Sequence, residues 1–219
     1  QKVICCLSTC IFPDKTSYPI DETMLHKGPP HYSNDAYAYA KRMLEIQCKI
    51  YREQYGKNFV CVIPTNIYGE HDNFSLEDGH VIPSLIHKCF LCKQKEEPFI
   101  VRGSGKPLRQ FIYSIDLAKL ILNILKDYKY NESIILSVSE KDEVSIKEVG
   151  TIIANKYNYV ENMEFDESFS DGQYKKTADN KKLLSFLNNE NIDFQFTNIK
   201  EGIEKTIDWF IDNYNGARK

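Results

Sequence analysis

The strongest constraint on the fold is the alternation of short apolar runs with longer segments of helical character. The runs KVICCL and NFVCVIP, at residues 2–7 and 58–64, are apolar enough to predict strands buried on both faces. Between them, residues 34–56 begin with a capping residue and end at Gly56, a helix stop signal. The alternation continues along the chain, so the sequence predicts an α/β fold with parallel strand pairing.

Composition excludes several classes of protein. With 219 residues, 42% of them hydrophobic, the chain can bury a core in one large domain or one and a half smaller ones. No apolar run approaches the roughly 20 residues of a membrane span, and the N-terminus lacks a signal-peptide layout. A net charge of −3 argues against a nucleic-acid footprint, and seven cysteines, an odd number, indicate reduced thiols. We therefore expect a cytoplasmic protein with neither a membrane nor a nucleic-acid partner.

Tyr37 and Lys41 stand four residues apart, which places them on one face of the expected helix. A phenol titrates near pH 10, so it exchanges a proton at neutral pH only if a nearby cation favours the phenolate. Lys41 can supply that charge. Composition alone produces about one Tyr-x-x-x-Lys spacing in such a chain, so the pair by itself is weak evidence for catalysis.

The segment LSTC, residues 7–10, follows the first strand at its carboxyl end, where ligands bind in open α/β sheets. Ser8 can donate a hydrogen bond to a carbonyl oxygen, and Cys10 can act as a base if its thiol is tuned toward neutrality. Each residue also has a structural interpretation. Ser8 can be a turn hydroxyl that caps its own backbone, and Cys10 a small buried hydrophobe.

Six segments combine these features in one order between residues 8 and 177: STCIFP, YAYAKRM, IPTNIYGEHDNF, DGHVIPSLIHK, GSGKPLRQFIYSIDLA and SDGQYKKT. In their order and spacing they resemble the extended short-chain dehydrogenase/reductases. Within that family they are most similar to the epimerase-reductases that act on GDP-4-keto-6-deoxy-D-mannose. The resemblance implies inversion at sugar carbons 3 and 5, followed by NADPH-dependent reduction of the 4-keto group, in a homodimeric enzyme that pairs through the Tyr37/Lys41 helix.

The resemblance also implies catalytic roles. Ser8 and Tyr37 would hold the carbonyl at carbon 4, and Tyr37 would protonate the alkoxide that forms on hydride transfer. Lys41 would bind the cofactor ribose and lower the pKa of the tyrosine. Cys10 and His80 match the base and the acid that the family uses for the two inversions. Without the resemblance, His80 reads as a polar residue at a helix N-terminus.

Contacts with two ligands follow from the same resemblance. For the cofactor NADP(H) it implies Lys41, Pro64, Asn66, Ile67 and His80. For the GDP-sugar it implies Lys88, Arg102, Arg109 and Asp171, with Lys175 or Lys176 assisting. The alternative for each lysine is a solvated surface charge, whereas the guanidinium of Arg109 suits a diphosphate. The family commonly has a tryptophan where Arg102 stands, although arginine can also stack on a base. The lone CFLC at residues 89–92 has no second half, so we expect no metal site.

The sequence contains no Gly-x-x-Gly-x-x-Gly turn, which in this family holds the cofactor pyrophosphate. We therefore expect about a hundred residues of βα units to precede this chain in the natural protein, and hydride transfer by the chain itself to be impaired. The alternatives are a non-catalytic GDP-sugar-binding or dimerising fragment, or another nucleotide-sugar epimerase or reductase. We expect two domains. The carboxyl-terminal part of a Rossmann-type parallel sheet domain would comprise residues 1–67 and 111–139. A smaller α/β substrate-binding domain would comprise residues 68–110 and 140–219.

Overall fold

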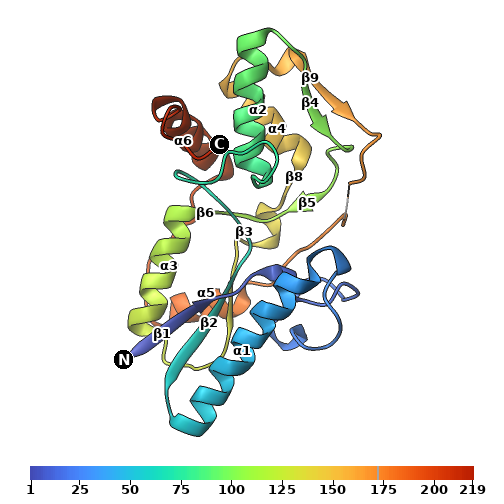
Figure 1. Ribbon diagram of the computed structural model, residues 1–219. Coiled ribbons are helices and arrows are strands. Elements are labelled where there is room, and N and C mark those ends of the chain that lie inside the picture. The colour runs from blue at the N-terminus through green and yellow to red at the C-terminus, as the bar shows by residue number, and fades with distance from the viewer. Residues whose placement is uncertain (172) are drawn as a thin grey trace. The chain divides into compact units, whose positions relative to one another are not determined.

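In the computed structural model, which describes residues 1–171 and 173–219, three of the apolar runs form a parallel sheet (Figure 1). The strand order is β1 (Lys2–Cys6), β2 (Asn58–Pro64), β7 (Ile134–Leu136). Cys5 lies opposite Cys61, and Ile63 lies opposite Ile135, so both pairings are parallel and in register. The predicted α/β fold with a Rossmann-type parallel sheet is confirmed.

Helix α1 (Asp35–Tyr55) connects β1 to β2 and packs along β2. Its buried residues recur every three or four positions, which turns one stripe of the helix toward the sheet: Ala38, Arg42, Glu45 and Cys48. The helix ends at Gly56, whose φ of 60° lies in the left-handed region that favours glycine. Two of the four inward residues, Arg42 and Glu45, are of charged types, which is unusual for a stripe that faces a core.

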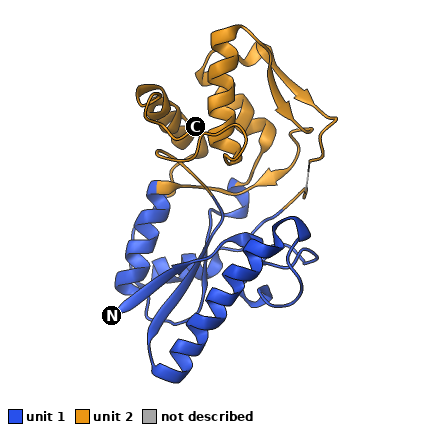
Figure 2. Ribbon diagram, in the orientation of Figure 1, with its two compact units in different colours: residues 1–66, 115–142, 176–195 blue, residues 67–114, 143–175, 196–219 orange. Residues whose placement is uncertain are grey.

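The chain divides into two compact units (Figure 2). Unit 1 comprises residues 1–66, 115–142 and 176–195, and unit 2 comprises residues 67–114, 143–175 and 196–219. The main difference from the expected division is the segment 176–195, which we placed in the second domain. It lies in unit 1 because α5 (Lys181–Asn189) packs on β7, and because the amide nitrogen of Asn180 donates to the main-chain oxygen of Ser137 at 3.1 Å.

Unit 1 also contains α3 (Ser114–Asp127) and three short 3₁₀ turns in the β1–α1 connection: η1 (Thr9–Ile11), η2 (Glu22–Met24) and η3 (Tyr32–Asn34). The Nζ of Lys2 donates to the carbonyl oxygens of Ile124 and Tyr128 at 2.8 and 2.7 Å, so a cation on β1 satisfies the last carbonyls of α3. The apolar core of this unit includes Ile11, Leu25, Cys48, Cys61, Ile63, Ile135 and Ala178.

Unit 2 is built from short strand pairs and three helices. The helices are α2 (Val81–Lys95), α4 (Ile146–Lys156) and α6 (Ile199–Asp212). The pairs are β3 (Asn66–Tyr68) with β6 (Phe111–Tyr113), β4 (Phe99–Arg102) with β9 (Met163–Asp166), and β5 (Leu108–Arg109) with β8 (Val144–Ser145). The β4–β9 pair is parallel and the β5–β8 pair is antiparallel. Two further 3₁₀ turns are η4 (Glu140–Asp142), in unit 1, and η5 (Val160–Asn162), in unit 2.

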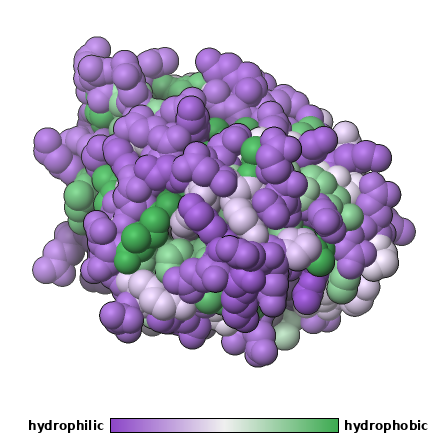
Figure 3. Space-filling model, turned by 90° about the horizontal axis from the view of Figure 1, so that it is seen from above, coloured by the Kyte–Doolittle hydropathy of each residue, from purple (hydrophilic) through white to green (hydrophobic). Residues whose placement is uncertain are grey.

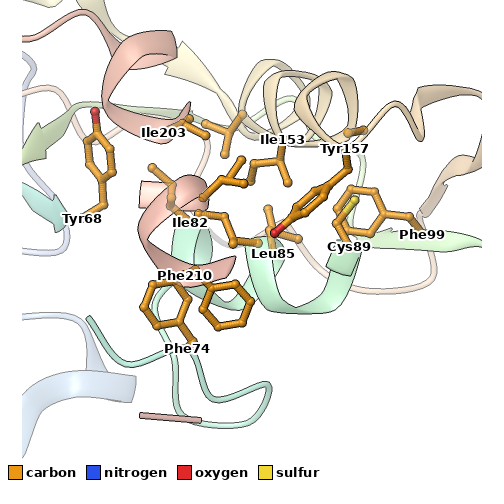
Figure 4. Close-up of a cluster of buried hydrophobic side chains, with 14 of the residues drawn as sticks. Tyr68, Phe74, Ile82, Leu85, Cys89, Phe99, Ile153, Tyr157, Ile203 and Phe210 are labelled. Carbon is orange, nitrogen blue, oxygen red and sulfur yellow. The ribbon is translucent and has the colours of Figure 1, made fainter. Parts of the chain in front are cut away.

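The core of unit 2 forms where α4 packs against α2 and α6 (Figure 4). The rings of Phe74 and Phe210 stack with their centroids 4.5 Å apart. Helix α6 comes close to Tyr68 at Gly202, where any side chain would overlap the tyrosine hydroxyl. The face in Figure 3 is mostly hydrophilic, with separate apolar residues between the polar ones, as is usual for a protein surface. No helix of the described residues is long and apolar enough to span a bilayer.

Candidate active site

The segment that follows β1 turns sharply at η1, and Ser8 occupies its N-cap position. The Oγ of Ser8 accepts a hydrogen bond from the amide of Cys10 at 3.4 Å and one from the thiol of Cys10 at 3.1 Å. The capping interpretation of Ser8 therefore describes its local geometry. This role does not use all the hydrogen-bonding capacity of Ser8, because a hydroxyl that accepts two bonds can still donate its own hydrogen.

Tyr37 and Lys41 lie on the first turns of α1, with the Nζ of Lys41 5.7 Å from the centroid of the Tyr37 ring. Burial raises the pKa of Tyr37, the nearby Cys10 thiol raises it further, and a hydrogen bond with Ser8 opposes the rise. The phenol therefore lies beside Ser8 and Cys10. We expected Lys41 to lower the pKa of Tyr37, but burial is the largest effect and moves it upward. The ammonium of Lys41 donates to the main-chain oxygen of Cys6 at 2.8 Å. At neutral pH Tyr37 is protonated and can act as an acid.

The structure thus brings four of the five predicted catalytic side chains together in unit 1, at the carboxyl end of β1. They come from two segments, the η1 turn and the start of α1. The arrangement supplies two hydroxyl donors, a thiol and a cation within one small region. Such a set can hold a carbonyl oxygen and move protons next to it.

His80, the fifth residue, lies in unit 2 at the N-cap of α2. Its side chain makes no capping hydrogen bond and is exposed, so the structural interpretation of this histidine leaves its imidazole unexplained. The carboxyl of Asp72 lies close enough to interact electrostatically with His80. Burial raises the pKa of this carboxyl, and the charges of His80 and Arg218 oppose that rise.

Unit 2 contains a cavity of about 390 Å³, a size within the roughly 300–1,000 Å³ of small-molecule sites. Apolar residues of α2 and β4 form part of its wall, among them Val81, Leu85, Ile100 and Val101. All four predicted GDP-sugar residues line this one cavity: Lys88, Arg102, Arg109 and Asp171. Three cations beside apolar walls suit an anionic ligand that also carries a flat or apolar part.

The three cations are held in different ways. Arg109 donates to the main-chain oxygens of Leu108 and Gln173, each at 2.7 Å, which fixes the plane of its guanidinium. The guanidinium carbon of Arg102 lies 4.8 Å from the centroid of the Phe169 ring. Burial lowers the pKa of Lys88, and the neighbouring Arg102 lowers it further. These like charges repel each other, so an anion in the cavity would relieve the repulsion.

Asp171 has a structural role that sequence reasoning missed. Its carboxylate accepts hydrogen bonds from the amide and the hydroxyl of Ser104, at 2.7 and 2.6 Å, and these bonds lower its pKa. The preceding Gly103 has a φ of 87°, and any side chain there would meet the same carboxylate. The Gly-Ser-Gly sequence signals a turn but does not identify its partner 67 residues away. Gly172, in the motif SDGQYKKT, lies outside the described residues.

The remaining predicted residues have diverse surroundings. Pro64 is buried at the end of β2, whereas Asn66 and Ile67 begin β3 and are exposed. Of the two assisting lysines, Lys175 forms an ion pair with Glu143 at 3.8 Å. Within the described part of the chain, no group of three or more His, Cys, Asp or Glu residues could hold a metal ion. All seven cysteines, including the pair at 89 and 92, are free thiols.

Comparison with known proteins identifies the class. The model of the NAD dependent epimerase/dehydratase family matches residues 1–137, which is more than half of the chain. The matched region contains the η1 turn, the Tyr37/Lys41 helix and His80. The chain belongs to this family.

Individual relatives narrow the class. The GDP-L-fucose synthase of Dictyostelium discoideum is 54% identical over 218 residues, covering 100% of this chain and 67% of the relative. The probable GDP-L-fucose synthase of Drosophila melanogaster is 50% identical and covers 100% of this chain and 69% of the relative. A crystal structure of a GDP-L-fucose synthetase from Naegleria fowleri bound to NADP has 52% identity and a TM-score of 0.94, covering 100% of this chain and 68% of that one. Within its family the chain groups with the GDP-L-fucose synthases, as the resemblance predicted.

Proposed function

We propose that this chain carries the catalytic and substrate-binding residues for the conversion of GDP-4-keto-6-deoxy-D-mannose to GDP-L-fucose. The observation that supports it best is the convergence of Ser8, Cys10, Tyr37 and Lys41 at the end of β1. The names of the relatives at 54% and 50% identity support the same substrate. The cavity in unit 2, with its three cations, supports a nucleoside diphosphate as the handle of that substrate.

For the epimerisation, the 4-keto group acidifies the hydrogens on carbons 3 and 5. Cys10, as the thiolate, takes the proton from one of these carbons, and the electron pair moves onto the oxygen at carbon 4. Ser8 and Tyr37 stabilise this oxygen by donating hydrogen bonds to it. His80, as the imidazolium, returns a proton to the opposite face of the same carbon, which inverts the centre. Proton exchange with water then restores the thiolate of Cys10 and the imidazolium of His80 for the second inversion.

For the reduction, the family cofactor NADP fits the polar groups at the carboxyl end of β1, the usual place of a dinucleotide in such sheets. Lys41 would hold its ribose hydroxyls, with Pro64, Asn66 and Ile67 beside it and His80 assisting. When bound, NADPH supplies the hydride for carbon 4. Tyr37, which its raised pKa keeps protonated at neutral pH, then gives its proton to the more basic alkoxide oxygen, and Ser8 keeps that oxygen in place.

Substrate binding would use the cavity of unit 2. Arg109 and Lys88 would bind the diphosphate, because charge-assisted bonds to phosphate are among the strongest available to a side chain. Arg102 would stack on the base, and Asp171 would hold the 103–104 turn that forms part of the wall. Lys175 or Lys176 would assist.

Two measurements on the 219-residue chain test the proposal. The first incubates the chain with the keto sugar nucleotide in D₂O without NADPH and follows deuterium at carbons 3 and 5 by mass spectrometry. The second follows NADPH oxidation with the same substrate. We expect deuterium incorporation by the native chain and its loss in Cys10→Ser. In His80→Asn we expect loss of the inverted product, because Cys10 can still exchange the proton on its own face. Unchanged incorporation in Cys10→Ser would refute the assignment of the base.

The same experiment separates the alternatives. Tight GDP binding with neither exchange nor NADPH oxidation would support a non-catalytic GDP-sugar-binding fragment. Faster turnover of a different 4-keto sugar nucleotide would support another epimerase or reductase of the superfamily. Exchange without NADPH oxidation would support impaired hydride transfer in this chain.

We also propose that the protein is a cytoplasmic homodimer that pairs through α1. Apolar residues on the outer side of this helix support the pairing, among them Met43 at 55% exposure and Ile50 at 39%. Sedimentation velocity should give twice the mass of the 25.5 kDa chain. Met43→Glu should reduce the measured mass to that of a single chain. Cell fractionation tests the compartment.

A further inference from the structure

Arg42 follows directly after Lys41 but lies on the inward stripe of α1, with only 7% of its surface exposed. A guanidinium remains charged at any physiological pH, so the helix turns a permanent positive charge toward the core. Burial lowers the pKa of Arg42, which reflects the unfavourable environment of this charge. A buried charge is expensive unless it is paired, so its place in the fold requires an explanation.

The contacts of Arg42 do not neutralise it. Its Nε donates to the main-chain oxygen of Ile11 at 2.6 Å, and its Nη2 is buried with no hydrogen-bond partner. The guanidinium also lies 5.7 Å from the ring centroid of Tyr39. Within the described residues, no carboxylate forms an ion pair with it. The short bond to Ile11 is therefore the main contact that holds this side chain.

That bond closes the turn that carries Ser8 and Cys10. The internal hydrogen bonds of the turn are long, 3.2 Å from the amide of Ile11 to Ser8 and 3.3 Å from the amide of Phe12 to Thr9. The bond from Arg42 is shorter, and it is charge-assisted, which makes it roughly twice as strong as a neutral one. Cys10 adds two bonds to the hydroxyl of Ser8, at 3.4 and 3.1 Å, so each bond inside the turn is longer than the bond that ties the turn to α1.

We propose that Arg42 is a positioning residue for the active site, which fixes the Ser8–Cys10 turn against α1 so that both side chains face the phenol of Tyr37. The inference rests on the proposed function, because it assigns to Arg42 the geometry on which that chemistry depends. A helical wheel would place Arg42 on the buried stripe with Ala38, but sequence alone does not identify the carbonyl that it binds.

The same helix offers a matched control. Arg52 also lies on α1, with 13% of its side chain exposed, and its Nη1 also donates to a main-chain oxygen, that of Phe59, at 3.1 Å. It differs in its place, at the far end of the helix from Tyr37, and in its ion pair with Glu45 at 3.7 Å. Both variants thus lose an arginine of α1 that donates to a main-chain oxygen, and only Arg42→Met releases the turn.

The test labels tyrosine with ¹³C at Cζ and follows the titration of Tyr37 by NMR. The groups that face this phenol are Ser8 and Cys10 from the turn and Lys41 from its own helix. Ser8→Ala should raise the pKa of Tyr37, because the hydrogen bond from Ser8 lowers it. Arg42→Met should shift it in the same direction by at least half as much, and Arg52→Met should leave it unchanged.

A second readout reports on the turn itself. Amide hydrogen exchange at Ile11 and Phe12 should accelerate about tenfold or more in Arg42→Met, as expected when one charge-assisted hydrogen bond is lost. If Arg42→Met does not fold, Arg42→Lys replaces it, because lysine retains the charge and most of the apolar stem. Arg42→Lys should show a smaller increase in amide exchange and a smaller shift of the Tyr37 pKa.

The outcomes are distinct. A folded Arg42→Met with native exchange at the turn and a native Tyr37 titration would overturn the inference. If Ser8→Ala also left the Tyr37 titration unchanged, the hydrogen bond on which the proposed site depends would be refuted, and the proposed function would fail with it. A shift in Ser8→Ala without one in Arg42→Met would refute the role of Arg42 alone.

Discussion

Arg102 stacks on Phe169, with its guanidinium carbon 4.8 Å from the ring centroid, at the wall of the unit 2 cavity. Under the proposed function, the free face of this guanidinium would stack on the base of GDP. A cation–π contact at an exposed site is worth about 0.5–1 kcal/mol, so Phe169→Ala should weaken GDP binding by about 2- to 5-fold in titration calorimetry. Pyrophosphate, which has no base, serves as the control ligand. An equal loss for pyrophosphate would contradict a role in stacking.

Tyr37→Phe should separate the two half-reactions. The variant lacks the phenolic proton, so NADPH oxidation should fall by about 10²–10⁴-fold, the range for a positioned acid. Deuterium exchange at carbons 3 and 5 should persist at a reduced rate, because Cys10 and His80 remain. The control is Tyr39→Phe, since Tyr39 lies two residues further on α1 and is also 51% exposed. Equal losses in the two variants would contradict the assignment of Tyr37.

Three thiols in the core of unit 1 should make the protein sensitive to alkali. Burial raises the pKa of Cys5, Cys48 and Cys61 from 9.0 to about 11 each. Because the folded state holds these protons more tightly, their contribution is complete below pH 9 and is lost as the pH rises through 11. The free energy of unfolding in urea should therefore fall across this window. The fall should be smaller in Cys5→Ala/Cys61→Ala; an identical slope would contradict the prediction.

Gly202→Ala should destabilise unit 2. A Cβ at this position would overlap the hydroxyl of Tyr68 and lie 3.0 Å from its Cζ, and Tyr68 is only 1% exposed. Overpacking of this kind costs about 1–3 kcal/mol, measurable by urea denaturation. Gly216→Ala is the control, because the nearest neighbour of its added Cβ is the oxygen of Asn213 at 3.9 Å. Similar stability of the two variants would contradict the argument.

The capping box at the start of α4 gives a prediction that depends on pH. Ser145 accepts from the amide of Glu148 at 3.1 Å, and the carboxylate of Glu148 accepts from the amide of Ser145 at 2.7 Å. Ser145→Ala should cost about 0.5–2 kcal/mol at neutral pH. The amide and the hydroxyl of Ser145 both donate to the Glu148 carboxylate, at 2.7 Å each, and these two bonds lower the pKa of Glu148. Their contribution is present above the ordinary value of 4.5 and is lost as the pH falls through the folded value; Ser145→Ala removes the bond from the hydroxyl.

The difference between native protein and Ser145→Ala should therefore shrink in acid. Thr151→Ala, which removes a hydroxyl bound to the oxygen of Lys147 at 2.8 Å in the same helix, controls for the loss of a side-chain oxygen. A difference that stays constant from pH 7 to pH 3 would contradict the capping argument.

Much of the architecture was predictable because its signals are local. The runs at 2–7 and 58–64 both form strands of the parallel sheet, and Gly56 ends α1 where the stop signal stands. The expectation of burial on both faces was wrong for β1, which lies at the edge of the sheet and is partly exposed. The family could be recognised because its motifs occur in order along the chain. The position of residues 176–195 could not be predicted, since nothing in α5 indicates that it packs on β7.

The sequence by itself determined the elements of this protein, because helix and strand periodicity depends on residues a few positions apart. It also determined which side chains can carry the chemistry. Only the tertiary structure decided which of them meet: the thiol of Cys10 and the phenol of Tyr37 come together because the η1 turn packs against α1, and Asp171 meets Ser104 across 67 residues. Such contacts depend on how distant segments fill a common core, and no local pattern encodes that.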